Sequence, residues 1–311
     1  MEQVGETTTQ AAPRRMVPRR SKDWSNTVGW TRRIVQAGFV AWLTFTLWQR
    51  ATAESEGGGS VESFCPFGGF ETAWTWITTG RTVPHTHSAN LVLAGIVVIL
   101  AIVARGFFCG WICVLGSLQD AVRAVGRRIE HAVPGLRGVR ALVARRAPWL
   151  GRVDRWLSWG RYAVLAWALG GAAVTGTMVF REIDPWSALI GIIEFEMSTG
   201  FVVLIAMLVL SLALDRPFCR YACPLGAVQG LITKASPVAI ERDAATCLGC
   251  DICNEACPMH IPVNTRTRVT DAECIGCLRC VAACPSRDAL ALRVALPIRA
   301  ITSSETEQAS C

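Results

Sequence analysis

Two runs of cysteines in the last quarter of the chain carry the clearest chemistry. Both have the spacing C-x2-C-x2-C-x3-C-P, and they consist of Cys247, Cys250, Cys253 and Cys257 before Pro258, and Cys274, Cys277, Cys280 and Cys284 before Pro285. Thiolates two residues apart in a tight loop can face three corners of one iron–sulfur cube, so each triplet needs a single distant fourth ligand. In this spacing the last cysteine of each run binds the other cluster. We therefore expect two [4Fe–4S] clusters.

The eight ligands then divide into two crossed sets. The first set is Cys247, Cys250, Cys253 and Cys284, and the second set is Cys274, Cys277, Cys280 and Cys257. Tetrathiolate zinc is the alternative, because zinc sites also use C-x2-C pairs. Zinc sites have four ligands in separated pairs, whereas triplets at two-residue spacing occur twice here. The pattern favours clusters, and with them electron transfer.

A second cysteine motif also occurs twice. The segments 108–119 and 218–229 read in register as F-C-x3-C-x-L-G-x-x-Q, which indicates an internal duplication. The candidate redox or metal-binding thiols of this motif are Cys109, Cys113, Cys219 and Cys223. On a helix, residues four apart have Cβ atoms about 5–6 Å apart, too far for a disulfide, so we expect the two copies to converge instead. Converged thiols would hold an extra metal or cluster, or exchange electrons as a dithiol; close packing of small residues is the alternative.

Long apolar stretches dominate the part of the chain before the cysteine runs. Hydrophobic residues make up 51% of the chain, and four stretches, about 34–50, 87–105, 161–180 and 197–215, approach the length of a bilayer span. Arginines gather before the first stretch and between the second and third, while acidic residues follow the first and third. The positive-inside rule then places both termini in the cytoplasm. The net charge of +7 is explained by this topology and does not indicate nucleic-acid binding.

The expected fold class is therefore an α-helical integral membrane protein with a small α+β domain. Its expected parts are a basic segment 1–29, a four-span unit 30–236 built from a two-span repeat, a ferredoxin-like domain 237–296 and a tail 297–311. We expect it to cross a bacterial-type cytoplasmic membrane several times.

These motifs together resemble the NapH family of membrane ferredoxins, which is similar to the C-terminal half of NosR. The segments 65–71 and 84–90 also look like this group, and the resemblance covers roughly residues 30–295. It implies electron transfer between the quinone pool and a partner redox protein, as a subunit of a quinol dehydrogenase. One departure is Val114, where the family pattern has proline, so we expect the first C-x3-C motif to continue as an unbroken helix.

The copper-reducing assembly protein CcoG is similar in the same motifs. That similarity supports an alternative function as a metal reductase, in which the C-x3-C thiols bind copper. A membrane redox sensor without turnover is a third possibility.

Quinol oxidation releases protons, so a quinone site needs a proton acceptor. The candidates are His85, His87 and Glu71. The chain has no G-x-G-x-x-G, P-loop or C-x-x-C-H motif, so electrons must come from or go to a partner with its own flavin, haem or iron–sulfur centre. Lipid and quinone complete the expected partners, and nucleic acid is not among them.

Overall fold

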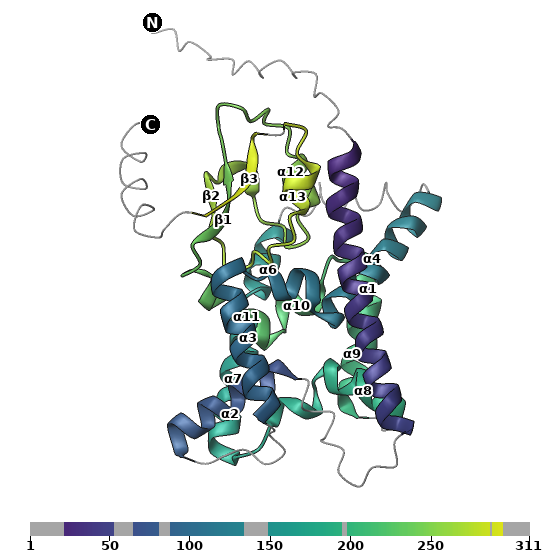
Figure 1. Cartoon of the computed structure of the whole chain (residues 1–311), viewed down its shortest axis with the longest axis vertical. Helices are drawn as coiled ribbons and strands as arrows, with labels where there is room; N and C mark the ends of the chain where they lie inside the picture. Colours follow the sequence, from purple (N-terminus) through teal and green to yellow (C-terminus); the bar gives the residue numbers. More distant parts are fainter. Residues whose placement is uncertain are drawn as a thin grey trace, which may run out of the picture.

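The computed structural model describes residues 22–52, 65–80, 88–133, 149–194, 198–286 and 288–294, and every structural statement below concerns these ranges. Figure 1 shows a helical part, with a small sheet and two short helices stacked on one of its ends. The helical part contains α1 (Lys22–Thr52), α2 (Pro66–Thr79), α3 (Ser88–Ala104), the π-helix η2 (Phe108–Ile112), α4 (Val114–Ala132), α6 (Trp149–Leu157), α7 (Gly160–Thr175), the 3-10 helix η3 (Val179–Glu182), α8 (Pro185–Glu194), α9 (Thr199–Ala213), α10 (Pro217–Tyr221) and α11 (Pro224–Thr233).

The smaller part, named here the dicluster part, holds both long cysteine runs. Its elements are β1 (Val238–Arg242), α12 (Ile252–Ala256), the 3-10 helix η4 (Val263–Thr265), β2 (Arg268–Val269), α13 (Arg279–Ala283) and β3 (Leu290–Val294). The strands form an antiparallel sheet in the order β2-β1-β3, and Ile240 pairs with Val269 on one side and Leu292 on the other. Ile240, Val269 and Leu290 are buried in the same core as the cysteines, so the sheet forms one wall of the cysteine region.

The duplicated segments form two copies of one helix–break–helix unit, named here the repeat. The first copy is α3-η2-α4 and the second is α9-α10-α11; α4 packs on α9, and α11 packs on α3. Each copy turns at a left-handed residue just before its motif, Gly106 at φ 43° and Arg216 at φ 48°. Because the second helix of each copy packs on the first helix of the other, the two motifs meet in the middle.

The expectation of an unbroken helix through the first motif is wrong. Cys113 has an extended conformation with ψ 118°, close to the ψ of 112° at Cys223, and α4 starts only at Val114. In both copies the amide of the second cysteine donates to the carbonyl of the phenylalanine five residues earlier, at 2.9 Å. This widened turn ends the helix in both copies, so proline at position 114 is not needed for the break.

The prediction of a four-span membrane protein is wrong. Among the described residues, no helix combines the length and the apolar character needed to cross a bilayer. The four expected stretches do coincide with α1, α3, α7 and α9, but α3, α7 and α9 have only 17, 16 and 15 residues. At about 1.5 Å per residue they reach roughly 25 Å or less, against about 30 Å of hydrocarbon. The longer α1, with 31 residues, includes several charged residues.

The sequence overestimated these lengths because backbone turns cut the apolar runs. Arg105 and Gly106, both at positive φ, follow α3, and Gly176 at φ 70° ends α7. The predicted multi-pass placement in a cytoplasmic membrane depended on these spans and is wrong for the same reason.

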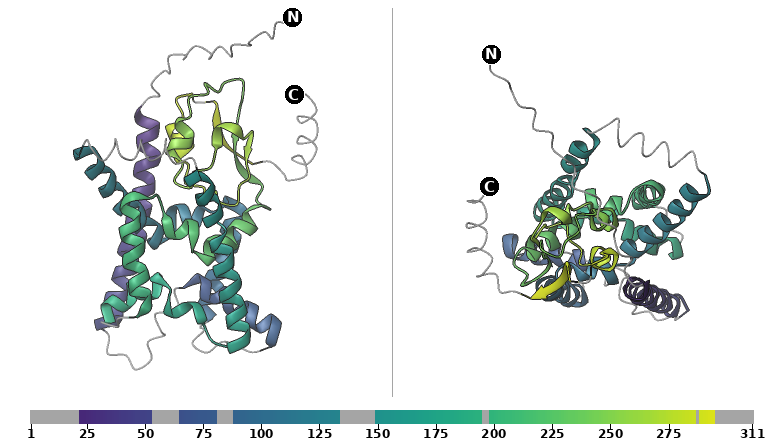
Figure 2. Two further views of the ribbon diagram at one scale, coloured as in Figure 1. Left: turned by 180° about the vertical axis from the view of Figure 1, so that it is seen from behind. Right: turned by 90° about the horizontal axis from the view of Figure 1, so that it is seen from above.

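In Figures 1 and 2 the dicluster part lies at one end, α2 and α8 lie at the other, and α1 runs along the side between them. The core of the helical part lies between these ends and includes Phe67, Val97, Leu165 and Leu204.

Candidate functional site

The two cysteine runs have the same backbone. In each, a glycine and the residue after the second cysteine are left-handed: Gly249 and Asp251 at φ 63° and 57°, Gly276 and Leu278 at φ 58° and 56°. A bulky residue such as Leu278 rarely adopts this conformation, so the surrounding fold must impose it. The short helices α12 and α13 begin at the next residue and carry the third cysteine of each run. The repeated left-handed residues curl each run into a loop.

Each loop encloses a hollow whose cysteines belong to one crossed set. The first hollow, of about 370 Å³ including the solvent at its mouth, is lined by Cys247, Cys250, Cys253 and Cys284. The second, of about 340 Å³ on the same measure, is lined by Cys257, Cys274, Cys277 and Cys280. In both cases three cysteines come from one run and the last cysteine comes from the other.

The donor set of each hollow fits an iron–sulfur cluster. A [4Fe–4S] cluster is held by four cysteine thiolates, and four cysteines line each hollow. Burial raises the pKa of the Cys257 thiol to about 12, so without a metal this thiol is protonated at neutral pH. Loading of the hollow must therefore release protons.

The two hollows differ in what surrounds them. Leu248, Cys250 and the exposed Gly249 and Asp251 border the first hollow, which opens on the surface of the dicluster part. In the second run the segment from Cys274 to Cys277 is buried against the repeat.

Glycines make the contact between the second run and the repeat possible. A Cβ atom added at Gly106 would lie 2.7 Å from the carbonyl oxygen of Cys274, and one at Gly110 would clash with the carbonyl oxygen of Ile275. The indole Nε1 of Trp111 donates to the carbonyl of Gly276 at 3.1 Å. The first copy of the repeat therefore packs directly on the second run.

The structure brings the four C-x3-C cysteines together at the centre of the repeat. The Cys109 thiol donates to Oε1 of Gln229 at 2.9 Å, and Nε2 of Gln119 donates to the Cys219 sulfur at 3.3 Å. Each motif's glutamine thus bonds the first cysteine of the other motif. Burial raises the pKa of Cys219 to about 11 and also raises the pKa of Cys109, so both are thiols at neutral pH.

In the described part of the chain, no three or more His, Cys, Asp or Glu side chains are grouped closely enough to hold a single metal ion, at the C-x3-C motifs or elsewhere. An extra metal or cluster at the C-x3-C cysteines, and copper reduction with it, stays a prediction.

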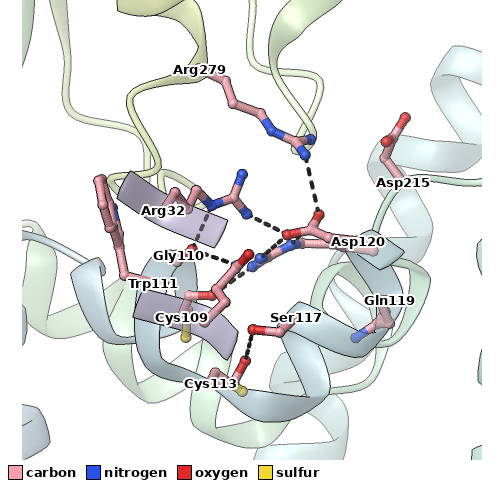
Figure 3. Close-up of polar contacts among 12 residues, drawn as sticks. Arg32, Cys109, Gly110, Trp111, Cys113, Ser117, Gln119, Asp120, Asp215 and Arg279 are labelled. Carbon is pink, nitrogen blue, oxygen red and sulfur yellow. Dashed lines mark hydrogen bonds and ion pairs between the residues drawn. The ribbon is translucent and has the colours of Figure 1, made fainter. Parts of the chain in front are cut away.

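A carboxylate with three arginines joins the repeat to α1 and to the dicluster part. Figure 3 shows Arg279 of α13 and Arg32 of α1 reaching Asp120. Arg216 is fully buried; its Nη2 lies 2.6 Å from Asp120 Oδ2, and its Nη1 donates to the carbonyl of Cys109 at 2.6 Å. These cations hold the pKa of Asp120 well below its usual range against the effect of burial. Asp120 is thus a fixed anion beside the central thiols.

A buried acidic pair lies at the opposite end of the molecule. Glu71 in α2 is only 2% exposed, and its Oε1 has no hydrogen-bond partner in the described structure. Burial, with the nearby Asp184, raises the pKa of Glu71 to about 8. Burial also raises the pKa of Asp184 to about 6, although that carboxylate accepts from the Trp186 amide and from the Cys65 thiol. The other two quinone-site candidates, His85 and His87, lie outside the described residues.

Several of these residues were not singled out from the sequence. Gln119 and Gln229 recur at the same register of the duplicated motif, which was a usable signal, and Asp120 follows Gln119 directly. Asp184 had no such signal, because its contacts join segments far apart in the chain.

Comparison with known protein families matches both cysteine-containing regions. A family model described as a 4Fe-4S dicluster domain covers residues 239–285. A second, described as a 4Fe-4S binding domain, matches twice, at 86–131 and 197–242, and so includes each copy of the C-x3-C motif. With the two cysteine-lined hollows, these matches define the class: the chain is an iron–sulfur electron-transfer protein.

Similar curated proteins narrow the class to a family. The chain is 28% identical to the putative electron transport protein YccM of Escherichia coli, over 81% of the chain and 71% of that protein. It is 28% identical to the ferredoxin-type protein NapH of Haemophilus influenzae, over 54% of the chain and 53% of that protein. It is also 27% identical to the methylamine utilization ferredoxin-type protein MauN of Methylorubrum extorquens, over 53% of the chain and 52% of that protein.

Together with the family models, these relatives support a NapH/NosR-type family of ferredoxin-type proteins. The chain spans about half the length of the NapH and MauN proteins that it matches. No solved structure matches the chain.

Proposed function

We propose that the chain is an electron-transfer subunit that exchanges electrons between a quinone and a partner redox protein. The two crossed cysteine sets would hold one [4Fe–4S] cluster each. The observation that carries this proposal is the lining of the two hollows, because each contains all four cysteines of one crossed set. A cluster in either hollow would supply reversible one-electron transfer.

The chain's own residues would bind and orient the clusters and shield one of them. The left-handed residues of each run shape the loop, and Cys257 and Cys284 cross to the other hollow from extended positions just before proline. Burial of Cys274, Cys277 and Cys280 places these ligands in a region of lower dielectric, which strengthens electrostatic interactions there. The first hollow, at the surface of the dicluster part, is the side on which we expect the partner protein to dock.

The buried acidic pair supports the quinone side of the proposal. Oxidation of a quinol releases two electrons and two protons, and a proton acceptor works best when its pKa lies near the working pH. Glu71 has a raised pKa of about 8, and its unpartnered Oε1 is available for a hydrogen bond to a quinol hydroxyl. Glu71 is therefore the proposed proton acceptor, with Asp184 as its neighbour.

Anaerobic purification with iron, sulfide and copper counts, followed by electron paramagnetic resonance, tests this function. We expect about eight irons per chain and cluster reduction by a soluble benzoquinol. Glu71→Gln should slow reduction by the quinol but leave reduction by dithionite unchanged. Stoichiometric copper without any response to the quinol would contradict the proposal.

A further inference from the structure

The two cysteine hollows have different electrostatic surroundings, and a buried arginine next to the second hollow contributes to the difference. Arg105 lies at the end of α3, is only 2% exposed, and has a left-handed backbone at φ 48°. Its Nη2 donates to the carbonyl of Asp271 at 3.1 Å, and its Nη1 lies 3.5 Å from the carbonyl of Val238. Arg105 therefore connects the repeat to β1 and to the segment just before Cys274.

The charge of Arg105 is directed at the second hollow. It interacts electrostatically with Cys274, one of the four cysteines that line the hollow. Arg105 Nε is buried and has no hydrogen-bond partner in the described structure. A cluster ligated by Cys274 would therefore lie next to a buried positive charge.

Arg105 is buried beside the second hollow without lining it, and the arginine at the first hollow has a different setting. Arg242 is the one arginine among its lining residues, is only partly buried, and donates through Nε to the carbonyl of Arg266 at 3.0 Å. Its charge is better screened by solvent than that of Arg105. The two hollows thus offer four thiols each, but the arginine beside the second hollow is more deeply buried than the arginine at the first.

We infer that Arg105 is a positioning residue that holds the second hollow against the repeat and makes a cluster there easier to reduce than a cluster in the first hollow. The inference rests on the proposed function, because it requires both hollows to hold clusters. Reduction adds a negative charge, and a buried cation in a region of low dielectric stabilises that charge more than an exposed cation does. Electrons in the chain would then collect at the second hollow, beside Cys109.

Redox titration of the whole loaded chain, followed by electron paramagnetic resonance, tests this inference. Cys250→Ser and Cys280→Ser identify the signals of the first and second hollows. Arg105→Gln should lower the midpoint potential of the second signal by on the order of 59 mV, a tenfold change in its reduction equilibrium for one electron. Arg105→Lys keeps the charge and should restore most of the shift. Arg242→Gln, the matched control, should leave the second signal unchanged.

An unchanged second potential in Arg105→Gln with all irons retained would overturn the inference, as would an equal shift in Arg242→Gln. If Arg105→Gln loses iron, Gly110→Ala provides the test instead. This substitution keeps the positive charge of Arg105, but its Cβ clashes with the carbonyl of Ile275 and so moves the repeat away from the second run. The second potential should fall in Gly110→Ala but not in Gly95→Ala, whose added Cβ meets no atom within 4 Å. An unchanged potential in Gly110→Ala would then refute the inference. Fewer than about eight irons in the unmodified chain would instead contradict the proposed function.

Discussion

The first and second cysteine runs have the same spacing and the same backbone but unlike environments. Gly249 and Gly276 share a left-handed conformation, yet an added Cβ would meet nothing within 4 Å at Gly249 and would lie 2.8 Å from the carbonyl of Arg105 at Gly276. The first run faces the surface, and the second is sealed against the repeat. Ligand spacing therefore specifies what a cysteine run can bind. The packing of the run against the rest of the chain determines how exposed the site is and which charges lie near it.

The largest effect on the packing of the second run against the repeat is expected from neutralising Asp120, the carboxylate between them. Asp120→Asn would leave Arg216 and Arg32, both buried, and Arg279 of the second run without their carboxylate. Loss of one partner from a buried ion pair costs about 3–5 kcal/mol of unfolding free energy. Chemical denaturation measures this loss.

Asp251→Asn in the first run is the matched control for that substitution. Asp251 is exposed, and asparagine tolerates its left-handed backbone, so the cost should be within about 1 kcal/mol. Equal losses in the two variants would show that the second run is not held in place by charge.

The pH dependence of the unfolding free energy tests whether the end of the molecule that contains Glu71 contributes to stability independently of the two hollows. Because the folded-state pKa of this carboxyl is raised to about 8, the folded protein binds the proton more tightly than the unfolded chain does. Stability should therefore fall as pH rises from the unfolded pKa of about 4.5 to about 8. Asp184, with its pKa raised to about 6, contributes to the lower part of this range.

Between pH 6 and pH 9, Glu71→Gln should reduce the fall in unfolding free energy by about 2–4 kcal/mol. Chemical denaturation at each pH measures this fall. The iron content of Glu71→Gln should equal that of the unmodified chain. A decline that persists in Glu71→Gln would show that other groups cause it.

The 4Fe-4S chemistry could be predicted from the sequence because cluster ligands follow a strict local spacing. Which cysteines share a cluster stays a prediction. The positions of α1, α3, α7 and α9 were also predictable from their apolar runs, since a helix buries or exposes side chains with a regular period. Their lengths were not, because Arg105 and Gly176 end helices through backbone conformations that an apolar run does not reveal.

The contact between the second run and the repeat could not be predicted from the sequence either. It depends on Gly106 and Gly110 meeting Cys274 and Ile275 more than 160 residues later in the chain, a pairing that no local pattern encodes. The position of Arg105 next to the second hollow could not be predicted for the same reason.

A glycine pair sharpens the comparison of the two runs. Gly249→Ala should cost about 1–2 kcal/mol, the price of a left-handed alanine. Gly276→Ala should cost roughly 2 kcal/mol more, because its Cβ also meets the carbonyl of Arg105. Denaturation of both variants gives the difference directly, and equal costs would mean that the second run moves away from the repeat without penalty.

The smallest effect is expected at the edge of the repeat. Arg127 pairs with Asp215, but its side chain is 46% exposed, so Arg127→Ala should change the unfolding free energy by at most about 1 kcal/mol. The midpoint potentials of the clusters in both hollows should stay unchanged. A larger loss would mean that the α4–α9 contact depends on surface charge rather than on apolar packing.

Cys284→Ser tests most directly the central claim, that two hollows are filled by crossed ligand sets. Cys284 belongs to the second run in sequence but lines the first hollow. Electron paramagnetic resonance of Cys284→Ser should therefore show a change in the signal that Cys250→Ser also alters, and an intact signal from the cluster that Cys280→Ser alters. A change confined to the Cys280 signal would contradict the crossed assignment.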